Sequence, residues 1–292
     1  MDFLKKLPGP LLIFLGAFCL SFGGLIVKSF EGSTLWQILF WRQLFFVIVV
    51  SIFLTINYKK EVVKKIYFTG IPGLIGGIIL GIGFSSYVFA MYNTTVANTN
   101  FIIQTQTIFL AIFGYFFLKE KISITTLLSI ILAISGLLLM LGSTLSTGQM
   151  LGNIVAFIMP ITFASLILIV RKYPNLDMIP LQLVAGSVAL IIGFIFSNKI
   201  LISPYDIFLA FLSGTFQLGL GFIFITIGAR KTLSAMVGII MLTEAILGPF
   251  WAWLFVNEDA SFYTLMGGSI IIFAVFLQFV STIKKENKYT SN

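Results

Sequence analysis

Long apolar stretches fill almost the whole chain and alternate with short polar segments. Ten stretches are long enough to cross a bilayer, and eight of them carry no charged side chain. An α-helix rises about 1.5 Å per residue, so roughly 20 residues cross a hydrocarbon core about 30 Å thick, where the backbone has to be helical. The pattern predicts an all-α polytopic membrane protein with ten transmembrane helices. The predicted spans are Pro10–Val27, Thr34–Ile56, Ile66–Tyr92, Val96–Leu118, Ile122–Leu141, Met150–Val170, Met178–Ser197, Ile207–Ala229, Ser234–Val256 and Ser261–Ile283.

The sequence also repeats itself. Residues 117–123 at the end of the fourth span and residues 255–261 at the end of the ninth share the pattern Phe-x-x-Glu-x-x-Ser. Lys28, which closes the first span, corresponds to Arg171, which closes the sixth. Each half holds five spans, an odd number, so the second half has to be inverted relative to the first, as in alternating-access transporters. We expect one repeat over residues 1–147 and a second over residues 148–292, with a short cytoplasmic tail.

Basic residues lie mainly in the loops on one side of the predicted membrane. With the N-terminus inside, 15 of the 18 Lys and Arg residues fall in cytoplasmic segments, Lys28 and Lys199 fall outside, and Arg42 lies within a span. Lys and Arg are enriched in cytoplasmic loops. We therefore expect a multi-pass protein of the cytoplasmic (inner) membrane with both termini in the cytoplasm and an uncleaved first helix.

Composition excludes several other classes. The chain is 59% hydrophobic and only 10% charged, which is unlike a soluble domain. Its net charge of +8 comes from lysines at span ends and not from one basic face, so nucleic acid is not an expected partner. The sequence has no histidine and a single cysteine, Cys19, so no Cys/His metal cluster exists. We expect no cofactor and no metal site, and the expected partners are membrane lipids and a small-molecule substrate.

The chain resembles the EamA-type permeases of the drug/metabolite transporter superfamily. The resemblance implies two inverted five-helix repeats around a central cavity lined mainly by spans one, three, four, six, eight and nine. It also implies small metabolites, often amino acids or amines, as cargo. The fourth span departs from the family pattern because it has no proline in its middle. The features that carry the resemblance are the two Phe-x-x-Glu-x-x-Ser endings, Lys28, Arg42, Tyr87, Ala90, Thr94, Ala97, Glu244, Pro249, Trp253 and Phe255.

Arg42 and Glu244 are the two ionisable residues placed deep in predicted spans. A charge in the bilayer centre is costly, so such residues usually face a bundle interior or a cavity. Glu244 is then a candidate for binding a cation or carrying a coupling proton. In the alternative interpretation, Glu244 is neutralised by Arg42 as a structural pair, or is protonated and hydrogen-bonded.

The fourth span is unusually polar. Asn100, Gln104 and Thr107 are spaced at i, i+4 and i+7, which places them on one face of a continuous helix. This face is a candidate wall of the substrate cavity, although hydrogen bonding between helices uses the same residue types. Gln106 is the repeat counterpart of Glu244.

Three further residues are candidates for binding the substrate. Tyr87 near the end of the third span is predicted to line the cavity or to belong to the core. Trp41 next to Arg42 is placed to face the cavity, where an aromatic ring suits a cationic or aromatic cargo. Lys28 lies on the external side, against the charge rule, and is a candidate for attracting a carboxylate, although snorkelling to the headgroups is the default for a lysine at a span end.

The sequence thus predicts a secondary transporter (permease) that moves a small organic metabolite, such as an amino acid or amine, by alternating access. A coupling proton or an exchange solute is a further expected partner. The nearest alternative is an efflux carrier for small cationic drugs or toxic compounds. A channel is disfavoured because the sequence has no carbonyl-rich filter such as Thr-Val-Gly-Tyr-Gly. An enzyme is disfavoured because the spans hold no histidine and no paired acids.

Overall fold

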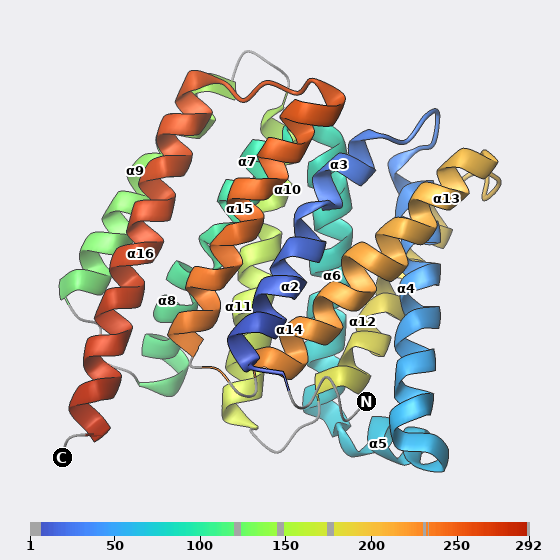
Figure 1. Cartoon of the computed structure of the whole chain (residues 1–292), viewed down its shortest axis with the longest axis horizontal. Helices are drawn as coiled ribbons and strands as arrows, with labels where there is room; N and C mark the ends of the chain where they lie inside the picture. Colours follow the sequence, from blue (N-terminus) through green and yellow to red (C-terminus); the bar gives the residue numbers. More distant parts are fainter. Residues whose placement is uncertain are drawn as a thin grey trace.

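A computed structural model of the chain describes residues 7–119, 124–144, 149–173, 178–229, 232 and 234–290, and every regular element in these residues is helical. Most of the helices extend between an upper and a lower end of the molecule (Figure 1). The elements are α2 (Gly9–Ser21), α3 (Gly23–Lys28), α4 (Leu35–Tyr58), η1 (Lys59–Glu61), α5 (Val62–Phe68), α6 (Gly70–Asn93), α7 (Val96–Gln104), α8 (Gln106–Leu118), α9 (Ile124–Thr144), α10 (Met150–Ala156), α11 (Ile158–Lys172), α12 (Met178–Phe196), α13 (Pro204–Leu212), η2 (Ser213–Leu220), α14 (Gly221–Ala229), α15 (Ser234–Val256) and α16 (Phe262–Thr290).

These helices follow the predicted spans, and several spans are built from consecutive pieces. The first span is interrupted at Phe22, the fourth at Thr105 and the sixth at Phe157. Within the described residues, five helical stretches are long and apolar enough to cross a membrane, and shorter apolar helices accompany them. The long stretches are Gly9–Lys28, Leu35–Phe68, Gly70–Asn93, Ile179–Phe196 and Pro204–Gly228, and the shorter helices are Ile124–Leu139, Met150–Leu166, Ile240–Val256 and Phe262–Leu277.

The connection between the second and third spans differs from the prediction, which began the third span at Ile66. The chain instead forms η1 and α5, and α6 begins only at Gly70. Lys59 and Gly70 both have a positive φ, 48° and 57°, so the backbone changes direction at each end of this connection. Hydropathy alone misses this, because Ile66, Tyr67 and Phe68 are as apolar as the span that follows.

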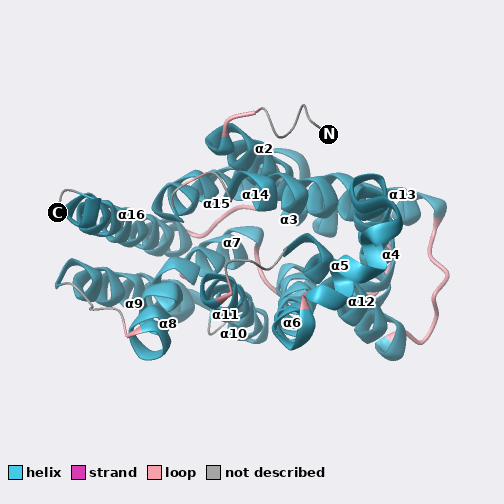
Figure 2. Ribbon diagram, turned by 90° about the horizontal axis from the view of Figure 1, so that it is seen from below, coloured by secondary structure: helices cyan, strands magenta, loops and turns pink. Residues whose placement is uncertain are grey.

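Helices from one half of the sequence pack mainly against helices from the other half. α2 contacts α14 and α15, α6 contacts α10, α11 and α12, α4 contacts α12 and η2, and α9 contacts α16. Seen from below, α9 and α16 form one extremity of an elongated cross-section, and α4, α12 and α13 form the other (Figure 2). The middle of the molecule is therefore an interface between the two halves.

Small residues allow the closest of these approaches. A side chain at Gly77 would lie 2.6 Å from Val184, and one at Gly81 would lie 2.7 Å from the carbonyl oxygen of Ala185. These glycines are spaced four residues apart on α6 and face α12, which is the geometry of small-residue packing between membrane helices.

Equivalent spans in the two halves run in opposite directions. α7 begins at the upper end and α8 finishes at the lower end, whereas α15 runs from the lower end to the upper end (Figure 1). The two-repeat, all-helical architecture predicted from the sequence is therefore present in the structure.

Candidate functional site

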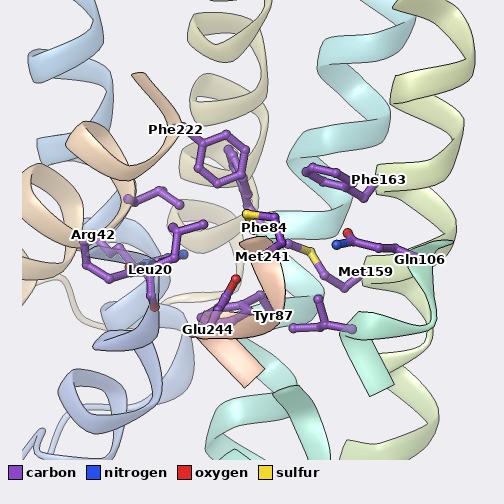
Figure 3. Close-up of a pocket in the computed structure, with 13 residues that line it drawn as sticks. Leu20, Arg42, Phe84, Tyr87, Gln106, Met159, Phe163, Phe222, Met241 and Glu244 are labelled. Carbon is purple, nitrogen blue, oxygen red and sulfur yellow. Dashed lines mark hydrogen bonds between the residues drawn. The ribbon is translucent and has the colours of Figure 1, made fainter. Parts of the chain in front are cut away.

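A small cavity lies between the two halves of the molecule, and polar side chains face it from several helices (Figure 3). Its volume is about 30 Å³, which leaves room for about two water molecules. In Figure 3, Arg42 and Gln106 lie on opposite sides of the view, with Tyr87 and Glu244 between them. The lining residues are Leu20, Arg42, Phe84, Tyr87, Ile103, Gln106, Met159, Phe163, Gln217, Leu218, Phe222, Met241 and Glu244.

Arg42 reaches this cavity from α4 and is only 1% exposed. Its Nε donates to the Ser213 hydroxyl at 3.1 Å, and its Nη2 donates to Gln217 Oε1 at 3.2 Å. The guanidinium carbon lies 5.1 Å from the centre of the Tyr87 ring, within cation–π distance. Among the described residues, Nη1 has no hydrogen-bond partner. The Nη1 nitrogen of this buried guanidinium is therefore available as a donor beside the cavity.

The partners of Arg42 come from η2, a π-helical stretch inside the eighth span. Ser213 and Gln217 are four residues apart and both face Arg42. Gly214 lies so close to the Arg42 carbonyl oxygen that a Cβ atom there would collide with it. π-Helical segments are rare and frequently occur at functional sites. Here the π-helical segment carries both acceptors that stabilise a buried cation.

Glu244 faces the cavity from α15 and is 6% exposed. In the part of the chain that the structure describes, no side chain forms an ion pair or hydrogen bond with its carboxylate. Its backbone carbonyl accepts a hydrogen bond from the Asn100 amide at 3.5 Å. Arg42 and Glu244 thus share one cavity without forming a direct ion pair.

Tyr87 lies between these two charged residues and is 4% exposed. Its hydroxyl has no hydrogen-bond partner among the described residues. That hydroxyl lies directly over Gly23 of α3, where a Cβ atom would collide with it. Gln217 completes this side of the cavity, because its Nε2 donates to the Leu20 carbonyl at 3.3 Å while its Oε1 holds Arg42.

The polar face predicted on the fourth span is divided in the structure. Asn100 and Gln104 are buried but are not among the cavity-lining residues, whereas Ile103 and Gln106 are. The helix is interrupted at Thr105, whose N–H bonds to the Ile102 and Ile103 carbonyls. Residues before and after Thr105 therefore do not share a face in the way that they would on one continuous helix. For Thr107 the structure describes the backbone, within α8, but not the side chain.

Trp41 lies beside the cavity residue Arg42 in the sequence but is not one of the lining residues. Its indole N–H donates to the Ile200 carbonyl at 2.7 Å. Trp41 thereby ties α4 to the segment that precedes α13.

Lys28 lies at the upper end of the molecule, where four residues form a set of contacts that we call the upper clamp: Lys28, Thr94, Val96 and Glu258. Lys28 Nζ donates to the Thr94 carbonyl at 2.7 Å and lies 3.4 Å from Glu258 Oε2. Glu258 Oε1 accepts from the Val96 N–H at 2.6 Å, at the first residue of α7. The upper clamp joins the ends of the first, third and ninth spans to the start of the fourth.

A chain of buried hydrogen bonds extends from the upper clamp. The Thr94 hydroxyl donates to Asn153 Oδ1 at 2.6 Å and accepts from Asn98 Nδ2 at 3.3 Å. The Thr264 hydroxyl donates to Asn98 Oδ1 at 2.8 Å. These bonds add α10 and α16 to the elements that meet at this end of the molecule.

Sequence reasoning missed the residues of η2. Gln217 is the only amide side chain in the apolar stretch of the eighth span. That is the same kind of signal that pointed to Asn100 and Gln104, so Gln217 was detectable. The hydrogen bond between Gln217 and Arg42 could not be predicted in the same way. The π-helical geometry that orients Gln217 toward Arg42 has no evident sequence pattern.

Comparisons with known proteins identify relatives of the chain. Two consecutive segments, residues 7–142 and 146–280, match the model of the EamA-like transporter family. A protein of Methanothermobacter thermautotrophicus described as an uncharacterized transporter is 26% identical over an alignment of 204 residues that covers 63% of this chain and 57% of that protein. The chain therefore matches less than two thirds of the length of this relative.

A solved crystal structure of a protein is similar to this fold. It matches with a TM-score of 0.67 and 11% sequence identity, over 95% of this chain and 98% of that chain. At this level of identity the likeness concerns the fold alone.

Proposed function

Because the chain belongs to the EamA-like transporter family, we propose that it is a secondary transporter that moves a small organic metabolite across the cytoplasmic membrane by alternating access. One observation carries this proposal: Arg42 and Glu244, two buried residues of opposite charge, face the same cavity between the halves without pairing. Buried charges are costly unless they are paired or hydrogen-bonded. A ligand that carries both charges would pair with each of them.

A zwitterionic amino acid fits this arrangement best. Its carboxylate would accept from the free Nη1 of Arg42 and from the unpartnered Tyr87 hydroxyl. Its ammonium group would be bound by the Glu244 carboxylate. Met159, Phe163 and Phe222 supply an apolar surface for a side chain. In this proposal Arg42, Tyr87 and Glu244 bind the substrate, and Gln217 positions Arg42.

The size of the cavity supports a cycle of closed and open states. A space of about 30 Å³ holds no metabolite, so loading requires the helices to separate at one end. The upper clamp closes one end, because its contacts join four of the spans that surround the cavity. We propose that the clamp breaks when the cavity opens to that side, which the charge distribution assigns to the exterior.

Glu244 is also the proposed coupling group. It is the only acidic residue within the predicted spans, and the chain has no histidine. In a proton-coupled cycle, the Glu244 carboxylate would carry the proton in one direction. In an exchanger it would instead alternate between the ammonium groups of two solutes.

An efflux carrier for small cationic compounds is the second candidate. It is favoured by the Glu244 carboxylate together with the rings of Phe84, Phe163 and Phe222 around the cavity. The buried Arg42 guanidinium disfavours it, because a purely cationic ligand would be repelled by a charge in the same cavity. A comparison of binding between ligands with and without a carboxylate therefore distinguishes the two candidate functions.

The first experiment is a thermal-shift screen of the purified protein against amino acids, matched amines without the carboxylate, nucleosides and sugars. A ligand at 100 times its Kd stabilises the folded protein by about 2.7 kcal/mol. We expect amino acids to raise the unfolding temperature. A shift with the amines alone would support cationic efflux, and no shift with any compound would contradict both.

The second experiment measures uptake and counterflow of the identified ligand in proteoliposomes. We expect saturable flux with counterflow, loss of flux in Glu244→Gln and Arg42→Lys at unchanged folded yield, and normal flux in the surface control Lys199→Gln. Unchanged flux and pH dependence in Glu244→Gln would remove that residue from the mechanism. Single-channel conductance would indicate a channel, and chemical conversion of the ligand would indicate an enzyme.

A further inference from the structure

The connection between the second and third spans forms a separate structural feature at the lower end of the molecule. We call Lys59–Phe68, which comprises η1 and α5, the interfacial segment. α5 lies across the lower end of the bundle near the end of α4 and does not continue its axis (Figures 1 and 2). The positive φ of Lys59 and of Gly70 turns the chain out of α4 before the segment and into α6 after it.

One face of the interfacial segment is held by the protein and the other is uncovered. Val62 packs against the main hydrophobic core, as does Tyr58 just before the segment. Val63, Tyr67 and Phe68 are 77%, 85% and 68% exposed. Three large apolar side chains on seven helical residues would be unfavourable in water. At the boundary of a bilayer, however, they suit the headgroup and upper acyl region.

The interfacial segment is also strongly basic. Lys59, Lys60 and Lys64 are exposed and Lys65 is partly exposed, against a single acidic residue, Glu61. Among the described residues, none of these four lysines forms an ion pair. Lys64 Nζ lies 5.7 Å from the centre of the Phe68 ring and Lys65 Nζ lies 5.8 Å from that of Tyr58. The charges are thus arranged around aromatic rings and have no anionic partner in the protein.

We propose that the interfacial segment binds the headgroups of anionic phospholipids in the leaflet at the lower end of the molecule. Basic residues next to a membrane span attract anionic lipids, and amphipathic helices with apolar and basic faces lie in the interface. Ile56 and Ile71 flank the segment and are 64% and 73% exposed, so lipid-facing surface continues on both sides of it. This continuity favours lipid over a soluble acidic protein as the occupant.

The test reads out the lipid that contacts the segment directly. The cysteine of a Val63→Cys variant, in a Cys19→Ala background, is labelled with an environment-sensitive fluorophore in the full-length protein. The protein is placed in nanodiscs that contain phosphatidylcholine and phosphatidylglycerol, with bromine on the acyl chains of one or the other lipid. We expect brominated phosphatidylglycerol to quench the fluorophore about fivefold or more above the level that its share of the lipid would give. A factor of about five is what the attraction of one lysine to an anionic surface contributes.

Two comparisons assign the preference to the segment. Replacement of its four lysines by glutamine should remove the preferential quenching, whereas replacement of Lys284, Lys285 and Lys288 by glutamine should preserve it. Equal quenching by the two lipids in the labelled protein would overturn the proposal. So would an equal loss of the preferential quenching in the two lysine variants. If the four-lysine variant does not fold, the same quenching measurement is made on the labelled protein at about 1 M salt. Screening of the lysine charges should then abolish the preferential quenching by phosphatidylglycerol. A preference that persists at this salt concentration would contradict the proposal.

Discussion

Arg42 illustrates how single residues make the central cavity possible. Its charge is almost fully buried, and two neutral acceptors on η2 provide the hydrogen bonds that replace water. Gln217 does more than Ser213, because its amide also donates to the Leu20 carbonyl and so joins the first, second and eighth spans. The stability of the cavity therefore depends on a residue that carries no charge.

This difference predicts an order of stability among variants of η2. Gln217→Leu leaves Arg42 Nη2 without its acceptor and removes the side-chain hydrogen bond to the Leu20 carbonyl, and we expect a loss of about 2–3 kcal/mol. Ser213→Ala removes one acceptor and should cost about 1–2 kcal/mol. Thr215→Val is the control in the same element, since the Thr215 hydroxyl is exposed and bonds only to its own helix. Denaturant unfolding in detergent measures the order, and equal losses for all three variants would contradict it.

Part of the candidate site is predictable residue by residue. Arg42 and Glu244 stand out because ionisable residues are rare in apolar spans, and Tyr87 stands out as an aromatic residue with a polar group near a span end. The structure brings all three to one cavity. The apolar lining, such as Met159 and Phe222, is not predictable, because the same residue types face lipid elsewhere in the chain.

At the scale of elements, the sequence predicts the spans better than their interior breaks. A continuous helix places Asn100 and Gln104 on one face with Thr107, but the interruption at Thr105 separates α7 from α8. The π-helical register of η2 likewise changes which residues face Arg42. Hydrophobic periodicity reports the length and type of an element, and it does not detect a local change in helical phase.

The upper clamp provides a prediction for one element, α7. Loss of an N-terminal hydrogen bond costs a helix about 0.5–2 kcal/mol, so Glu258→Ala should accelerate amide exchange at Val96 roughly 2- to 30-fold. Lys28→Met is the matched control, because it removes the ion pair and leaves the Glu258–Val96 bond in place. Hydrogen–deuterium exchange of the peptide that starts α7 measures both. Equal acceleration in the two variants would show that the ion pair holds α7.

At the scale of the whole molecule, the two halves depend on each other. The core cluster combines side chains of both halves, including Ile13 and Phe84 from the first and Ala185 and Phe222 from the second. Among the described residues, each of the three core clusters contains side chains of both halves. The count of five spans per half dictates the inversion, so the overall architecture follows from span number alone. The packing of the halves depends on side-chain shape, which span number does not reveal.

The inversion makes a prediction about the two sides of the membrane. Lys119 follows α8 at the end of the fourth span, and Asp259 follows α15 at the end of the ninth, and both are exposed. Cysteines at these two positions, each in a Cys19→Ala background, should react with an impermeant maleimide from opposite sides of the membrane. Lys199→Cys is the control, because it should react from the same side as Asp259→Cys.

The charge distribution assigns these sides. Asp259→Cys and Lys199→Cys should react from outside, and Lys119→Cys only after the cells are permeabilised, since most basic residues lie in the loops on the Lys119 side. Reaction of Lys119→Cys and Asp259→Cys from the same side would contradict the antiparallel arrangement of the halves. Alternating access by an exchange of roles between two inverted repeats would then be excluded, because that mechanism requires the two halves to have opposite topologies.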